Sequence, residues 1–141
     1  MKVASVLARK GGAVVTIRPE QTVREALRLF GEHCIGALVV VDHTRKMVGM
    51  ITERGILRSA LTSERVFSET VSAVMTEEVV TGHPEDDLMA VARTMTEKRI
   101  RHLPILDQGN LVGIVSLGDV VKAQRDQYEG QVETLETQLP G

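Results

Sequence analysis

The amino-acid sequence predicts an α+β fold, α/β-like in its element order, made of two similar β-α-β-β-α lobes. Three segments of the first half return in the second: residues 14–20 at 79–85, 34–42 at 99–107, and 48–52 at 112–116. Thr16 corresponds to Thr81, an offset of 65 residues, and Gly49 corresponds to Gly113, an offset of 64. The copies therefore differ in length by a single residue. A tandem repeat this regular sets the architecture before residue propensities are considered.

The composition is that of a globular protein with an aliphatic core. The chain has 141 residues, of which 43% are hydrophobic, with two Phe, one Tyr and no Trp. A lobe of roughly 60 residues is marginal on its own, so we expect the two lobes to share one core.

The charge is nearly balanced, with 17 basic and 19 acidic residues and a formal net charge of −2. This balance gives no general attraction to nucleic acid or membranes, and no apolar run approaches the roughly 20 residues of a membrane span. The N-terminal apolar stretch is too short for a signal peptide, and the single Cys34 cannot form an internal disulfide. We therefore expect a cytoplasmic protein that binds neither nucleic acid nor membrane.

The first copy opens with a β-branched strand at residues 14–17, which ends before Pro19. Thr22 and Glu25 form a Thr-x-x-Glu capping box that starts a helix ending at Gly36. Its apolar stripe has helical spacing and comprises Val23, Ala26, Leu27 and Phe30. A buried strand, a hairpin turn and a returning strand are expected at residues 37–41, 42–46 and 47–51.

The second copy has the same order. Asp87 is the expected N-cap of a helix that ends near Arg101. Its apolar stripe comprises Leu88, Val91, Ala92 and Met95. The buried strand, turn and returning strand are expected at residues 103–106, 107–110 and 111–115.

Further helices flank the copies. A polar connection at residues 63–70 leads into a short helix at 71–76, and residues 3–7 form a weaker counterpart before the first copy. Closing helices begin near Thr52 and Ser116.

The last helix runs from Asp119 towards Leu139, and Gly130 is expected to interrupt it. Its apolar residues keep heptad-like spacing: Val121, Tyr128, Val132, Leu135 and Leu139. One interpretation is a solvated, partly frayed tail. The other is a short coiled coil or clamp against a partner subunit.

No group of residues has the pattern of a catalytic or metal site. The four histidines lack metal-ligand spacing. Cys34 lies in an apolar stretch without a basic neighbour, which favours a buried, inert thiol over a nucleophile.

Residues 113–120 place a buried strand directly before a helix, with Ser116 as N-cap and Asp119 three residues later. The structural interpretation is a Ser-x-x-Asp capping box that satisfies helix amides. The functional interpretation uses the same geometry, because a helix N-terminus offers N–H groups to a phosphate and an aspartate there can accept hydrogen bonds from two ribose hydroxyls. Gly118 leaves space where a ligand would approach.

Upstream, Arg101 and His102 place cations beside a buried strand. Taken alone they indicate surface charge at a helix–strand junction. Near Ser116 and Asp119 they have the character of phosphate ligands.

The duplicated pattern resembles the cystathionine-β-synthase-type (CBS) domain family. The resemblance rests on residues 101–107 (Arg-His-Leu-Pro-Ile-Leu-Asp) and 113–119 (Gly-Ile-Val-Ser-Leu-Gly-Asp) and covers about residues 1–125. It implies lobes with small three-stranded sheets flanked by helices, paired about a pseudo-twofold axis as a Bateman module that often dimerises. The expected divisions are repeat one at 1–62, a linker at 63–70, repeat two at 71–125 and a C-terminal helical extension at 126–141.

The resemblance also implies a function. The family binds adenine nucleotides or related ligands, such as AMP, ADP, ATP, NAD or S-adenosylmethionine, and is regulatory rather than catalytic. No cofactor is required, and the nucleotide is a regulatory ligand. The chain is most similar in kind to small stand-alone bacterial CBS-domain proteins.

By this resemblance, two clefts each use both repeats. In the main cleft Asp119 would hold ribose, Ser116 ribose or phosphate, and Arg101 and His102 phosphate, with Gly118 leaving room. The residues that would enclose adenine are Ile114, Val14, Val15, Ile35, Gly36 and Ala37. An insertion around residues 9–12 leaves Lys10 without an assigned role.

The second cleft would use Met50, Thr52, Arg54, Val79, Val80, Ile100 and Arg101. Gly55 stands where the ribose aspartate belongs, and Gly36 and Ala37 replace the basic pair. Losing a charged partner for two hydroxyls costs about 1.5–3 kcal/mol, roughly ten- to over a hundredfold in affinity. We expect this cleft to be weak, empty or occupied by a ligand held without a cis-diol clamp, and Arg54 to be able to attract an anion.

The favoured function is non-catalytic sensing of an adenine nucleotide, such as energy sensing, with a signal passed through a homodimer or an unidentified protein target. The alternative is a ligand-independent dimerisation or assembly module that works through its C-terminal helix. An enzyme is least supported, because the chain has no room for the separate cofactor domain that cystathionine β-synthase needs.

Overall fold

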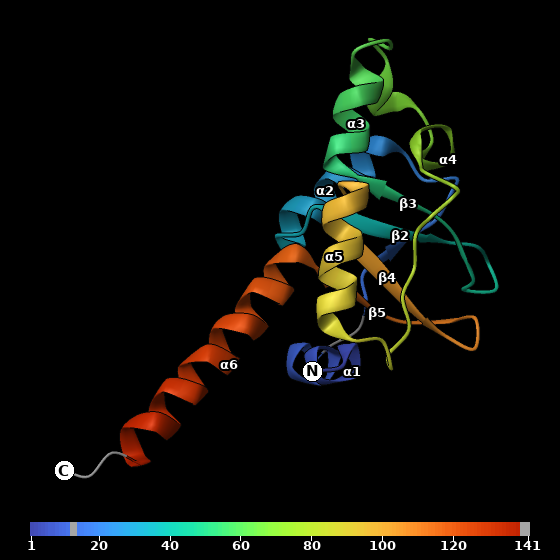
Figure 1. Cartoon of the computed structure of the whole chain (residues 1–141). Coiled ribbons are helices and arrows are strands. Elements are labelled where there is room, and N and C mark those ends of the chain that lie inside the picture. The colour runs from blue at the N-terminus through green and yellow to red at the C-terminus, as the bar shows by residue number, and fades with distance from the viewer. Residues whose placement is uncertain (12–13, 139–141) are drawn as a thin grey trace.

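The computed structural model describes residues 1–11 and 14–138, with side chains as far as residue 131. Its helices and strands in chain order are α1 (Val3–Lys10), β1 (Thr16–Ile17), α2 (Val23–His33), β2 (Ala37–Val41), β3 (Met47–Thr52), α3 (Glu53–Ala60), α4 (Val71–Val74), α5 (Leu88–Lys98), β4 (His102–Asp107), β5 (Asn110–Ser116) and α6 (Leu117–Gln138). A 3-10 turn, Val66–Ser68, precedes α4. The α+β class and the expected element order are confirmed (Figure 1).

The first lobe contains a three-stranded sheet in the order β1-β2-β3. β1 pairs in parallel with β2 through Thr16 and Ile17, and β2 pairs antiparallel with β3. The strand expected at residues 14–17 is shorter than predicted, because Val14 and Val15 lie outside the ladder.

The second lobe departs from the prediction of three strands, because its sheet contains only β4 and β5 among the described residues. A single parallel bridge joins Gly82 to Ile105, with bonds from Gly82 N to Pro104 O and from Leu106 N to Gly82 O, both 2.9 Å. Extending this ladder by one more pair would need an N–H donor at position 104, and proline has none. Pro104 therefore limits the third strand to a bridge.

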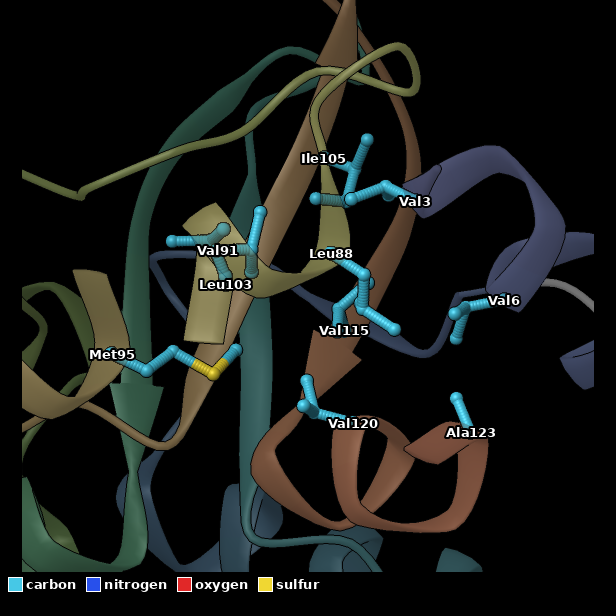
Figure 2. Close-up of a cluster of buried hydrophobic side chains, with 10 residues drawn as sticks. All are labelled: Val3, Val6, Leu88, Val91, Met95, Leu103, Ile105, Val115, Val120 and Ala123. Atoms are coloured by element: carbon cyan, nitrogen blue, oxygen red, sulfur yellow. The ribbon is translucent and has the colours of Figure 1, made fainter. Parts of the chain in front are cut away.

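Each lobe has its own aliphatic core, and the helix that leads into each repeat packs on the opposite lobe. Figure 2 shows Val3 and Val6 of α1 within the core of the second lobe, beside Leu88 and Val115. In return, Val71 of α4 is buried in the core of the first lobe.

Matching backbone bonds anchor these two exchanged helices. Val3 N donates to Asp86 O at 2.9 Å at the start of α5, and Val71 N donates to Gln21 O at 2.7 Å at the start of α2. The repeats are thus related in their interlobe contacts as well as in their sequence.

A third apolar cluster joins the lobes. Ala37, Val39 and Met50 of the first lobe pack with Val79 and Ile114 of the second repeat. The single shared core that the size of the chain predicted is therefore two lobe cores connected by this third cluster.

The helix ends differ from prediction in three places. α2 ends at His33 rather than Gly36, because Cys34 takes a left-handed conformation with φ 53°. α5 ends at Lys98, with Arg99 in the same conformation at φ 55°. α6 continues through Gly130 without interruption, since one glycine costs a long helix only about 1 kcal/mol.

Two further expectations concern side chains. The prediction of a buried Cys34 thiol is wrong: this residue is exposed, because it follows the end of α2 at the surface. Of the heptad positions in the last helix, Val132 and Leu135 lie beyond the described side chains and Leu139 lies outside the described residues.

None of the described helices is both long enough and apolar enough to cross a bilayer.

Candidate functional site

The main cleft is a cavity of about 380 Å³ between the two lobes. The structure brings together nine of the predicted residues in its lining: Val14, Val15, Ile35, Gly36, Ala37, His102, Ile114, Ser116 and Asp119. The first five come from the first repeat and the others from the second, so both repeats build the cavity.

Ser116 and Asp119 form the predicted reciprocal capping box at the start of α6. Ser116 N donates to Asp119 Oδ2 at 2.8 Å, and Asp119 N donates to Ser116 Oγ at 3.1 Å. The structural interpretation of this motif is therefore correct. It is compatible with the functional one, because the Asp119 carboxylate has a second oxygen and its side chain remains 20% exposed at the cleft.

Lys10 is the main site residue that sequence reasoning did not place. Its Nζ lies 2.9 Å from Asp119 Oδ2 and donates to Ile114 O at 2.8 Å. The last turn of α1 carries Lys10 there because α1 packs on the second lobe. Nothing in the local sequence indicates this contact, since Lys10 and Ile114 are 104 positions apart.

The electrostatics of the cleft keep Asp119 ionised. Partial burial alone would raise the pKa of Asp119. The hydrogen bond from the Ser116 amide and the ammonium group of Lys10 outweigh burial and lower this pKa below its ordinary value of 3.8. A carboxylate acceptor is therefore present at neutral pH.

His102 forms the wall between the main cleft and a second cleft, and it lines both. Burial lowers the pKa of His102 below 6.5, and the charge of Lys10 lowers it further, against the opposing effects of Glu53 and Asp119. The imidazole is therefore neutral at pH 7, so it can donate or accept a hydrogen bond but adds no positive charge.

Two predicted residues of the main cleft lie elsewhere. Gly118 and Arg101 line a depression at the start of α6, which shares His102 and Ser116 with the main cleft, and Arg101 also lines the second cleft. His102 and Arg101 both line the second cleft and the depression, and only His102 also lines the main cleft. The roles of Arg101 and His102 towards phosphate therefore stay a prediction, with Arg101 outside the lining of the main cleft.

The second cleft has a volume of about 240 Å³. It contains every predicted residue: Met50, Thr52, Arg54, Val79, Val80, Ile100 and Arg101. Thr52 Oγ1 accepts a hydrogen bond from Gly55 N at 3.0 Å, which is one half of a capping box whose other half would need a side chain at position 55. The lining residues that were not predicted include Glu53, Arg58, Glu78 and Arg99.

Within residues 1–11 and 14–138, no three or more His, Cys, Asp or Glu side chains are grouped so that they could hold a metal ion.

Comparisons with known proteins agree with this architecture. The family model for the CBS domain matches residues 4–62 and 71–126. The CBS domain-containing protein YhcV of Bacillus subtilis (strain 168) is 41% identical over 111 residues, which is 79% of this chain and 79% of that protein. The crystal structure of the CBS-domain containing protein ATU1752 from Agrobacterium tumefaciens is 37% identical, with a TM-score of 0.83 over 87% of this chain and 92% of that one.

Two other similar crystal structures contain adenosine ligands. CBSX2 in complex with AMP is 27% identical, with a TM-score of 0.75 over 90% of this chain and 98% of that one. The CBS domain pair of protein MJ0100, in complex with 5′-methylthioadenosine and S-adenosyl-L-methionine, is 26% identical, with a TM-score of 0.80 over 90% and 98% of the two chains. CBS-domain proteins are generally regulatory and non-catalytic. This chain belongs to the CBS-domain family and contains one such domain in each of its two repeats.

Proposed function

We propose that this protein is a regulatory module that binds an adenine nucleotide, such as AMP, ADP, ATP or NAD, in the main cleft. The observation that carries the proposal is the position of Asp119, an ionised carboxylate at the edge of an apolar cavity built from both repeats. The AMP complex of the similar protein CBSX2 supports the choice of ligand.

In this proposal each wall of the cleft has a role. Val14, Ile35 and Ile114 enclose the adenine ring, and Asp119 accepts hydrogen bonds from the ribose hydroxyls. Lys10 contacts Asp119 Oδ2, so Oδ1 stays open to the ribose, and the ammonium group lies where it can attract a phosphate.

Ligand binding would change the arrangement of the two lobes, because the ligand contacts both repeats. A ligand that touches two lobes favours the lobe arrangement in which both sets of contacts are made. The free energy that can be passed on to a homodimer or protein target is at most the difference in ligand-binding free energy between the two lobe arrangements.

The test is titration calorimetry with AMP, ADP, ATP and NAD on the whole chain and on Asp119→Asn. We expect the variant to lose about tenfold to a hundredfold in affinity, because an amide is a weaker acceptor for two hydroxyls than a carboxylate. Asp126→Asn is the matched control, since Asp126 lies on the same helix but does not line the main cleft. A ligand at 100 times its Kd should also stabilise the fold by about 2.7 kcal/mol in thermal unfolding.

Two results would contradict the proposal. Equal nucleotide affinity in the Asp119→Asn variant and the unaltered protein would show that the site is misassigned. If none of the four nucleotides binds, the proposed nucleotide-binding function is wrong.

A second candidate function is ligand-independent assembly through α6. This helix extends away from the rest of the molecule (Figure 1), and its Val121 and Tyr128 are 58% and 68% exposed. Their spacing of seven residues places them on one face, as in a coiled coil.

Light scattering distinguishes the two functions. The assembly function predicts a dimer whose mass does not depend on nucleotide and which becomes a monomer when the chain is truncated after Arg125. A dimer that survives this truncation excludes α6 as the assembly element.

A further inference from the structure

The depression beside the first turns of α6 has a volume of about 560 Å³. Its lining includes three basic residues, Arg101, Lys122 and Arg125, and none of its described lining residues is acidic. Two apolar residues of the same lining, Leu117 and Val121, are 38% and 58% exposed. We call this surface the basic groove. Its positive charge and exposed apolar area suit an acidic amphipathic segment.

The rest of α6 has the opposite charge. Residues 126–138 contain four acidic residues and no Lys or Arg. Figure 1 shows this part of α6 extending away from the rest of the molecule. Because α6 is one continuous helix from Leu117 to Gln138, its acidic end cannot fold back onto its own first turns. It can reach a basic groove only in a second copy of the chain.

The exposed face of α6 has both apolar and charged residues at intervals of seven. Val121 and Tyr128 are 58% and 68% exposed, and Lys122 and Glu129, each one position later, are also exposed. Arg125 lies between these pairs, with its side chain 61% exposed and 3.7 Å from Asp126 of the same helix. In heptad terms Val121 and Tyr128 occupy d positions, Arg125 an a position, and Lys122 and Glu129 e positions.

This pattern discriminates between two orientations of paired helices. In a parallel pair, Arg125 would lie opposite Arg125 of the second copy, and the g positions that flank the e positions hold the uncharged Gln124 and Gln131. In an antiparallel pair, a positions lie opposite d positions and e positions opposite e positions. Arg125 then lies opposite Tyr128 of the second copy, a cation–π contact, and Lys122 lies opposite Glu129 of the second copy. Twofold symmetry makes each of these contacts twice.

We propose that the basic groove binds the acidic end of α6 from a second copy of this chain, with the two helices antiparallel. In this register residues 132–136 of the second copy, which include two glutamates and no basic residue, run beside the groove. The proposal rests on the second candidate function, assembly through α6, and adds to it the docking surface and the orientation. It does not depend on nucleotide binding in either cleft.

The experiment is sedimentation equilibrium on the whole chain, which measures the dimer dissociation constant. Lys122→Glu and Glu129→Lys each replace two attractive pairs by two repulsive ones, so each should raise this constant at least about tenfold. The double variant should return it to within about threefold, because both pairs form again with exchanged charges. Residues 122 and 129 are about 10 Å apart along one helix, so they cannot compensate each other within a chain.

An equimolar mixture of the two single variants provides a second readout. Lys122→Glu protein has two acidic e positions and Glu129→Lys protein has two basic ones, so an antiparallel mixed dimer has only attractive pairs. We expect it to form at least about tenfold more tightly than either variant dimerises alone. The control is Lys98→Glu, which reverses the same charge at an exposed position at the end of α5 and should leave the dissociation constant within about threefold.

The outcomes separate a wrong orientation from a wrong function. If truncation after Arg125 dissociates the dimer but the double variant does not restore it, α6 assembles the protein in another arrangement and the proposal is overturned. If the dimer survives truncation, or the unaltered chain is a monomer, assembly through α6 is itself wrong.

A test on the unaltered protein covers the case in which a charge variant fails to fold. Carbodiimide coupling of mixed isotope-labelled and unlabelled copies should join the Lys122 peptide of one copy to the Glu129 peptide of the other. A cross-linked dimer without this product would overturn the proposal.

Discussion

His102 lies where the two clefts meet, together with Gly36. It lines both cavities, and its Cε1 lies 3.6 Å from the place where a Cβ of Gly36 would be. A Cβ at position 36 would make ordinary van der Waals contact with His102 and with the Glu53 carboxylate. A charge on His102 would be felt in either cleft.

The titration of His102 predicts how stability depends on pH. Burial, assisted by Lys10, lowers its pKa in the folded protein below the ordinary 6.5. The unfolded chain therefore binds a proton more readily, and folding stability is lost as the pH falls below about 6.5. The lowered pKa of Asp119 acts in the same direction, but only below its ordinary 3.8.

We expect the melting temperature to fall between pH 7.5 and pH 5.5, and to fall less in His102→Gln. Scanning calorimetry at both pH values measures this difference. His43→Gln is the control, because His43 lies exposed in a hairpin turn. An unchanged pH dependence in His102→Gln would show that His102 is not the group responsible.

Individual residues of the site differ in how far the sequence predicted them. Ser116 and Asp119 were predictable because their bonds join residues three apart in a recognisable cap. Lys10 was not, because its partner lies across the interface between the repeats. The place of Arg101 in the second cleft and outside the lining of the main one was also not predicted, because it depends on how the repeats pack together.

Among the elements, α1 is the one whose prediction differs most from the structure. The sequence predicts a weak helix at residues 3–7, whereas α1 extends to Lys10 and belongs to the core of the second lobe. The effect of Pro104 on the second sheet is easier to trace to the sequence. Once the pairing of Gly82 with Ile105 is known, the missing N–H of this proline explains why the ladder stops there.

The packing of α1 predicts that Val3→Ala destabilises the protein by about 2 kcal/mol, because Val3 is fully buried and loses two methyl-sized groups. The loss should appear in chemical denaturation. Hydrogen exchange should increase in β4 and β5 rather than in β1, β2 and β3. Val121→Ala, at an exposed position, should change stability by less than about 0.5 kcal/mol. Faster exchange confined to the first lobe would contradict the assignment of α1 to the second.

At the scale of the whole molecule, duplication produced one scaffold and two unequal clefts. The exchanged helices α1 and α4 connect the lobes symmetrically. The cleft residues are not symmetric, since Asp119 and Lys10 occupy one site and a cluster of arginines occupies the other.

By itself, the sequence determined the repeat, the order of helices and strands, the caps of α2, α5 and α6, and the inequality of Asp119 and Gly55. These features depend on residues that are close in the chain or related by the repeat. Only the tertiary structure decided that α1 crosses to the second lobe, that Lys10 meets Asp119, and that four arginines converge in one cavity. The reason is physical: these contacts join distant parts of the chain, so they arise from burying apolar helix faces between the lobes and not from local patterns.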